Sequence, residues 1–138
     1  MQYIIDGHNL IPKIPGLTLS DPEDERKLID LLIPFLRLTR SRAKVFFDNA
    51  PKEQSGERHY GLVKAVFVPA GQSADKAIID YIHKLGGESR NHHLVSSDRM
   101  IQVAARARHV PVIKSEAFAD RLVEKLAEDP KRRRLLKD

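Results

Sequence analysis

Four aspartates stand where short apolar segments of the chain end, and carboxylates in such positions can do metal chemistry. Asp6, Asp48 and Asp98 each close or directly follow an apolar run, and Asp75 opens a segment with helical periodicity. Two carboxylates about 4 Å apart repel by roughly 4 kcal/mol at an effective dielectric near 20, so a cluster of four needs a counter-charge. The chain has no cysteine and no histidine pair with zinc-like spacing. The predicted partner is therefore a hard cation, Mg²⁺ or Mn²⁺.

Two of these aspartates also have an ordinary structural explanation. Asp98 could serve only to start a helix, and Asp75 could serve only the positive end of a helix dipole. Asp6 and Asp48 are harder to explain in this way, because an acid after an apolar strand is seldom buried without a partner. A shared acidic site accounts for all four residues.

The charge balance favours a polyanionic partner for such a site. The sequence carries 24 Lys and Arg against 19 Asp and Glu, a net charge of +5 with a pI of about 9.6. Cations on the protein can hold a polyanion while metal ions activate water and stabilise a leaving oxygen. An acidic metal site in a basic protein thus suggests a phosphodiester substrate.

The segments around these residues predict alternating strands and helices. Apolar runs rich in β-formers indicate strands over 3–6, 44–48, 62–68, 93–96 and, more weakly, 110–113. Helices are expected to begin at 20–23, near 73, at 97–98 and at 115, the first with a kink or break at Pro34. Residues 49–61 are rich in turn formers and mixed charge, and are expected to form a mobile loop.

This order predicts an α/β fold, a three-layer sandwich with a mostly parallel central sheet of about five strands. The carboxyl ends of parallel strands share one edge, so the four aspartates should converge there. A chain of 138 residues fits one domain, expected over residues 1–128 and followed by a basic tail over 129–138.

Several motifs in this order resemble a known family. They are Ile4-Ile5-Asp6-Gly7-His8-Asn9, then Val45-Phe46-Phe47-Asp48, then Ser73-Ala74-Asp75, then Ser96-Ser97-Asp98-Arg99. Together they are similar to the NYN domain of the YacP-like branch of the PIN-like ribonucleases, over most of residues 1–120. The resemblance implies a PIN-like fold and endoribonuclease activity with an acidic centre of the Mg²⁺ or Mn²⁺ type.

Carried over residue by residue, the resemblance implies roles for the acids and one amide. Asp6, Asp75 and Asp98 would bind the metal. Asn9 would orient the Asp6 carboxylate, a metal water or the substrate phosphate. Asp48 matches the acid after the second strand, and would bind the metal directly or support a residue that does.

A second group of residues is assigned to the substrate. Ser96 and Ser97 would position a metal-bound water or the RNA, although Ser97 could instead cap a helix. Arg99 and Lys114 would reach phosphates, with a surface role and a role in capping the sheet as their respective alternatives. His8 lies in a turn, and a structural or substrate-facing role is expected rather than that of a general base.

One departure from the family pattern concerns the number of metal ions. Some PIN-like members carry a second acid directly after the helix aspartate, where this chain has Lys76. Asp80 is a poor substitute, because five residues along a helix place it about 140° around from Asp75. At least one metal ion is predicted, and a second stays open.

Two other classes of function compete with the nuclease. One is a non-catalytic PIN-like module that binds RNA without cleaving it, which Lys76 favours. The other is a receiver-like phosphoacceptor domain using Asp48, Ser96 and Lys114, although the first strand lacks the adjacent acids of receivers. RNA is the expected partner, with a ribosome or RNA-processing complex left open. The chain lacks an apolar leader and any membrane-length apolar run, so a cytoplasmic location is expected.

Overall fold

The computed structural model describes residues 1–129 and contains one six-stranded sheet. The strand order is β3-β4-β2-β1-β5-β6, and every neighbouring pair is parallel except β3 and β4. The predicted α/β fold with a mostly parallel sheet is confirmed. The strands are β1 Gln2–Asp6, β2 Arg42–Ala50, β3 Gly56–Tyr60, β4 Val63–Pro69, β5 His92–Val95 and β6 Val112–Ile113.

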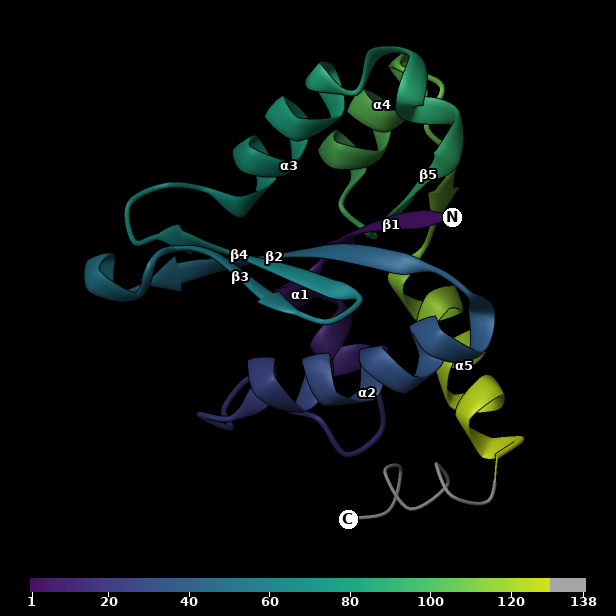
Figure 1. The fold of residues 1–138 in the computed structure, drawn as a ribbon. Coiled ribbons are helices and arrows are strands. Elements are labelled where there is room, and N and C mark those ends of the chain that lie inside the picture. The colour runs from purple at the N-terminus through teal and green to yellow at the C-terminus, as the bar shows by residue number, and fades with distance from the viewer. Residues whose placement is uncertain (130–138) are drawn as a thin grey trace.

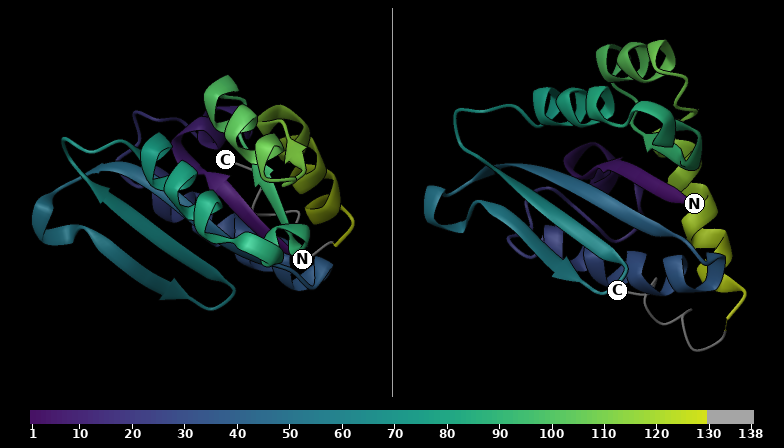
Figure 2. Two further views of the ribbon diagram at one scale, coloured as in Figure 1. Left: turned by 90° about the horizontal axis from the view of Figure 1, so that it is seen from above. Right: turned by 45° about the horizontal axis from the view of Figure 1, so that its top comes forward.

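Helices cover both faces of this sheet (Figure 1). Helices α3 (Ala74–Lys84) and α4 (Arg99–Ala107) lie side by side over one face, while α2 (Asp24–Thr39) and α5 (Ser115–Ala127) cover the other (Figure 2). A short helix, α1 (Gly7–Leu10), follows β1 directly and continues into the 3-10 turn η1 (Ile11–Lys13). Two further 3-10 turns are η2 (Lys52–Gln54) and η3 (Gly86–Asn91).

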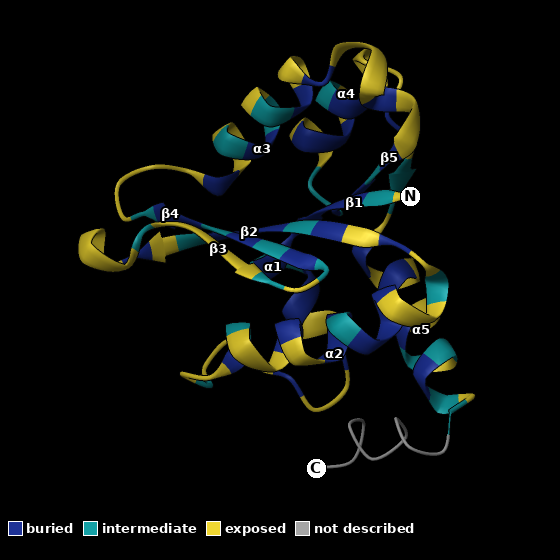
Figure 3. Ribbon diagram, in the orientation of Figure 1, coloured by how far each residue is buried: buried dark blue, intermediate teal, exposed yellow. Residues whose placement is uncertain are grey.

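The strands β1 and β2 are apolar on both faces because each face packs against helices. Successive side chains point to opposite sides, so alternate residues of one strand enter two different cores. The core towards α2 and α5 contains Tyr3, Ile5, Val45 and Phe47, and the core towards α3 and α4 contains Ile4, Phe46 and Leu94. Burial is greatest along these central strands, whereas β3 is largely exposed (Figure 3).

Three expectations for the chain need correction. The segment 49–61 is not a loop throughout, since η2 and the antiparallel edge strand β3 lie within it. Helix α2 begins at Asp24, after a turn in which the Asp21 carboxylate accepts a hydrogen bond from Glu23 N at 2.8 Å. Nor does Pro34 divide α2, because buried residues before and after it hold both halves of the helix against the sheet.

The predicted basic tail of residues 129–138 lies outside the described residues, apart from Asp129. Within residues 1–129, no helix is both long and apolar enough to cross a membrane.

Candidate active site

The structure brings the four predicted aspartates to one edge of the sheet. Asp6 is the last residue of β1, Asp75 lies in the first turn of α3, and Asp98 caps the N-terminus of α4. Asp48 lies two residues before the end of β2, at an irregularity of the strand. The carboxylates of Asp75, Asp98 and Asp48 all act on the charge of Asp6, so the edge is strongly acidic.

A β-bulge sets the direction of Asp48. Phe47 pairs with Phe67 and Ala50 with Pro69, so two residues of β2 face a single residue of β4. The extra residue, Asn49, has a φ of 59°, a left-handed conformation that asparagine tolerates better than most residues. Bulges of this kind bend a strand and redirect side chains.

Asp6 is the most buried carboxylate of this cluster, with 8% of its surface exposed. Burial, followed by the charges of Asp75, Asp98 and Asp48, raises the pKa of Asp6 to about 6, and the hydrogen bond from the Ser96 hydroxyl opposes this shift. The pKa of Asp75 is raised by burial and then by Asp98 and Asp48. Both shifts indicate that burial and mutual repulsion disfavour negative charge at this edge.

No basic side chain within residues 1–129 forms an ion pair with Asp6, Asp75 or Asp98. Lys76, the residue after Asp75, pairs instead with Asp80 at 2.9 Å. Over the same residues, no three His, Cys, Asp or Glu side chains are arranged as a ready metal-ligand set.

Ser96 links two of the aspartates. Its buried hydroxyl donates to Asp6 Oδ2 at 3.3 Å and accepts from Asp98 N at 3.1 Å, while its carbonyl accepts from Gln102 Nε2 at 2.8 Å. Asp98 Oδ1 in turn accepts from Ile101 N at 3.1 Å. Asp98 therefore has the helix-starting role foreseen as its alternative, and it performs this role at the acidic edge.

Asn9 ties three elements together at the same edge. Its Oδ1 accepts from Ser97 N at 2.9 Å and from Ser115 Oγ at 2.5 Å. Ser97 does not cap the helix that follows it, because its hydroxyl accepts from Ser115 N at 3.0 Å and donates to Glu116. These bonds join α1, the loop after β5 and the start of α5.

His8 bridges two carboxylates. Its Nδ1 lies 2.6 Å from Asp48 Oδ1, and its Nε2 lies 2.7 Å from Glu25 Oε2. The hydrogen bond to Glu25 raises the pKa of His8 to about 9, aided by Asp48 and opposed by burial. His8 is therefore a cation at neutral pH, and it supplies the counter-charge for Asp48.

Comparison with known proteins now identifies the family of this fold and site. The family model of the YacP-like NYN domain matches residues 3–135. The chain belongs to the YacP-like NYN domain family. Members of this family are PIN-like nucleases. No curated protein sequence matches the chain.

Two crystal structures of Rae1 (YacP) from Bacillus subtilis share the fold of this NYN domain. One superimposes with a TM-score of 0.78 at 20% identity, covering 97% of this chain and 80% of that chain. The other, a W164L mutant, has a TM-score of 0.75 at 20% identity, covering 100% of this chain and 84% of that chain. At this identity, the likeness supports the fold.

The remaining predicted residues of this NYN domain lie around the aspartates. Arg99 is the exposed first residue of α4, directly after Asp98, and Lys114 is exposed at the start of α5. Neither forms an ion pair within residues 1–129. Both are open to an anionic ligand, and their assignment to the substrate stays a prediction.

Two residues of this site were not anticipated from the sequence. Ser115 is fully buried and hydrogen-bonded to Asn9, and its place at the start of α5, two residues after β6, is the signal that could have revealed it. Glu25 comes from the first turn of α2, where an acid is explained by the helix dipole alone. No spacing in the sequence pointed from Glu25 to His8.

Proposed function

We propose that this NYN domain is a metal-dependent endoribonuclease that hydrolyses RNA phosphodiester bonds at the aspartate cluster. The observation that carries the proposal is the convergence of Asp6, Asp75 and Asp98 without a basic partner among residues 1–129, in a chain that belongs to a family of nucleases. The net charge of +5 favours a polyanionic substrate.

The donor set suits Mg²⁺ or Mn²⁺. Asp6, Asp75 and Asp98 offer carboxylate oxygens as ligands, and a divalent cation would offset the unfavourable negative charge that the raised pKa values of Asp6 and Asp75 indicate. Mg²⁺ usually keeps several waters as ligands, so its binding does not require a ready three-ligand set, which residues 1–129 lack. Asp6, Asp75 and Asp98 would hold it.

Such an ion, when bound, would supply the activated water and the Lewis acid that phosphodiester hydrolysis needs. The protein's own groups would do the positioning. Ser96 holds Asp6 and the start of α4 in place, and the His8 cation fixes Asp48 instead of acting as a general base. Arg99 and Lys114 would bind the phosphates beside the cleaved bond.

Cleavage of a labelled RNA in Mg²⁺, Mn²⁺ or EDTA tests this proposal. We expect cleavage with either ion and none in EDTA, and a loss of about 100-fold or more in Asp6→Asn and in Asp98→Asn. Asp120→Asn, an exposed change on α5, is the matched control and should leave the rate unaltered. Wild-type cleavage rates in both site variants would rule the proposal out. RNA binding without any cleavage would favour the non-catalytic module.

A further inference from the structure

A cavity of about 200 Å³ lies on the α2 side of the sheet, beside the His8 bridge. Its wall comes from the start of α2, the end of β2, η2, and strands β3 and β4. Glu25 belongs both to this wall and to the bridge, where it contacts His8 Nε2 at 2.7 Å. Asn49, the residue after Asp48, also lines the cavity. The cavity therefore adjoins the edge that carries the aspartates.

Two arginines of the cavity wall lie over aromatic rings. The guanidinium carbon of Arg58 is 4.8 Å from the centre of the Phe67 ring, and that of Arg26 is 5.2 Å from the centre of the Tyr60 ring. Stacking of this kind holds a guanidinium plane in place while its N–H groups stay available at the edges.

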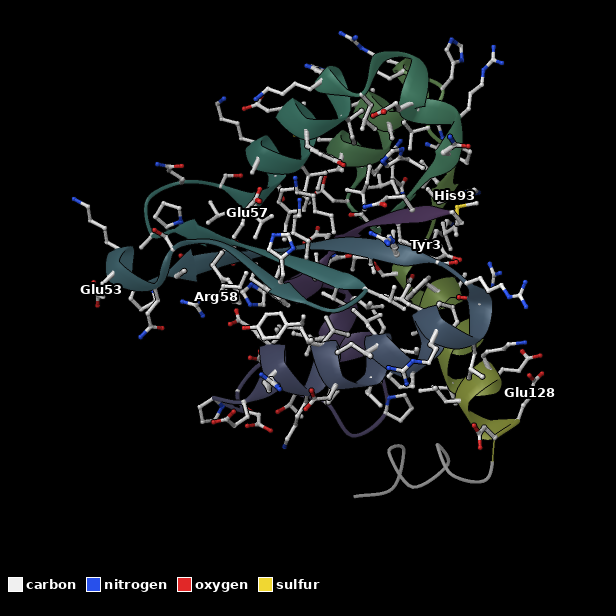
Figure 4. The ribbon with its side chains drawn as sticks, viewed as in Figure 1. Tyr3, Glu53, Glu57, Arg58, His93 and Glu128 are labelled. Atoms are coloured by element: carbon white, nitrogen blue, oxygen red, sulfur yellow. The ribbon has the colours of Figure 1, made fainter. Side chains whose placement is uncertain are left out.

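These two arginines differ in their polar partners among the described residues. It donates to the carbonyl of Gln54 at 2.9 Å and has no carboxylate partner within residues 1–129, whereas Arg26 pairs with Asp30 at 3.1 Å. Arg58 lies on the side of the sheet that faces α2, and its neighbour Glu57 lies on the opposite side (Figure 4). The positive charge of Arg58 is thus directed to this cavity.

The lining fits a flat ligand with a polar edge. Guanidinium planes and aromatic rings stack on nucleobases, and this is how proteins hold unpaired bases of RNA. The side-chain amides of Asn49 and Gln54 can donate to and accept from the edge of a base, and the carboxylate of Glu25 can accept. The volume of about 200 Å³ is large enough for one base.

We propose that this cavity receives one unpaired base of the RNA strand whose phosphodiester lies at the aspartates. The inference rests on the proposed ribonuclease function, because a strand whose phosphodiester lies at the aspartate cluster would run close to Asn49, the residue after Asp48, which lines the cavity. It adds to that function a site for a base whose edge is free to form hydrogen bonds with the protein.

A tryptophan reporter tests base binding without cleavage. The chain has no tryptophan, so Tyr60→Trp places a single indole in the cavity wall, and an Asp75→Asn background keeps the RNA intact. The probe is a short unstructured oligoribonucleotide. We expect saturable quenching of the indole, and binding about 5- to 100-fold weaker when Arg58→Gln is added. An oligomer of the same length without bases should not quench.

Two matched variants control this measurement. Arg42→Gln removes an exposed strand arginine at the opposite edge of the sheet and should leave the affinity unchanged. Tyr81→Trp places the indole on α3, on the other side of the sheet, and should not be quenched. Absent quenching at position 60, equal quenching by the abasic oligomer, or unchanged affinity in Arg58→Gln overturns the proposal.

A second measurement uses no tryptophan reporter and therefore tests the proposal even if the Tyr60→Trp variant does not fold. In the wild-type protein, an abasic nucleotide at one position near the cleaved bond should raise KM about 5- to 100-fold, and Arg58→Gln should abolish the penalty at that position alone. An equal increase in KM for an abasic nucleotide at every position would contradict base binding in the cavity. If the indole is quenched but the wild-type protein does not cleave RNA, base binding in the cavity is supported and the nuclease proposal is rejected. If the wild-type protein cleaves RNA but neither quenching nor a position effect is seen, the nuclease proposal is supported and base binding in the cavity is rejected.

Discussion

His8 Nδ1 lies 2.6 Å from the Asp48 carboxylate, so one of the four aspartates at the sheet edge has an internal counter-charge. The other three aspartates have none within residues 1–129. His8, Asp48 and Glu25 form a structural ion-pair bridge, whereas the other three carboxylates are available to a metal ion. Both the His8 bridge and the three remaining aspartates have measurable effects on stability.

The His8 bridge should make stability depend on pH. The folded protein holds the proton of His8 with a pKa of about 9, against 6.5 ordinarily. The stabilisation is therefore complete below about pH 6.5 and is lost as the pH rises through about 9. We expect the free energy of unfolding in urea to fall by about 1–3 kcal/mol between pH 7 and 9.5, the partial exposure of the pair reducing the effect.

The variant His8→Gln should be less stable than wild type at pH 7 and should lose most of this pH dependence. Its control is His59→Gln, an exposed change on β3. An identical pH profile in wild type and His8→Gln would contradict the assignment of the bridge.

Asp6 should cost the folded protein stability when no metal is present. Its folded pKa of about 6 exceeds the ordinary 3.8, so the penalty is relieved towards pH 4 and is complete above about pH 6. Asp6→Asn keeps an acceptor for Ser96 and removes the charge. We expect it to raise the free energy of unfolding at pH 7.5 by about 1–3 kcal/mol.

Asp120→Asn serves as the control for this comparison. A saturating divalent cation should reduce the difference in the free energy of unfolding between Asp6→Asn and wild type, because it stabilises the wild type alone. A less stable Asp6→Asn protein in metal-free buffer would speak against a charge penalty at Asp6.

Gly7 is needed where α1 approaches β2. A Cβ at this position would lie 2.6 Å from Phe47 Cδ1 and 3.0 Å from the Phe46 carbonyl oxygen, and Phe47 is fully buried. Gly7→Ala should therefore lower the free energy of unfolding by about 1–3 kcal/mol. The matched change Gly87→Ala meets no atom within 4 Å and should have little effect. Equal melting temperatures for the two variants would refute this close approach.

Asn9 should support the site through its two hydrogen bonds. Asn9→Ala leaves Ser97 N and the buried Ser115 hydroxyl without their acceptor, at an expected cost of about 1–3 kcal/mol in thermal or urea unfolding. Asn91→Ala, an exposed change in η3, is the control. Wild-type stability in Asn9→Ala would show that these bonds contribute nothing to the fold.

The acidic edge could be predicted because it follows from local patterns and one rule of topology. Asp6 and Asp98 come at or just after apolar strands, and parallel strands end at one edge. The bulge that aims Asp48 could not be seen, since it depends on how β2 and β4 pair. Glu25 was missed because its contact with His8 joins elements through the fold rather than through spacing.

Strand β3 was missed for a different physical reason. Its residues, Gly-Glu-Arg-His-Tyr, show neither the alternation nor the apolar run of a strand. An edge strand has one free side and can carry charge on it, which protects against pairing with other chains. This element is defined by its pairing with β4, which the pattern of its side chains does not reveal.

Uptake of Mn²⁺ by the folded protein tests the central claim most directly, for example by titration calorimetry with Asp75→Asn and Asp120→Asn in parallel. We predict saturable binding in wild type and in Asp120→Asn, and at least about 10-fold weaker binding in Asp75→Asn. No detectable uptake of Mn²⁺ by the wild-type protein, even with RNA present, would contradict the claim that Asp6, Asp75 and Asp98 form a cation site.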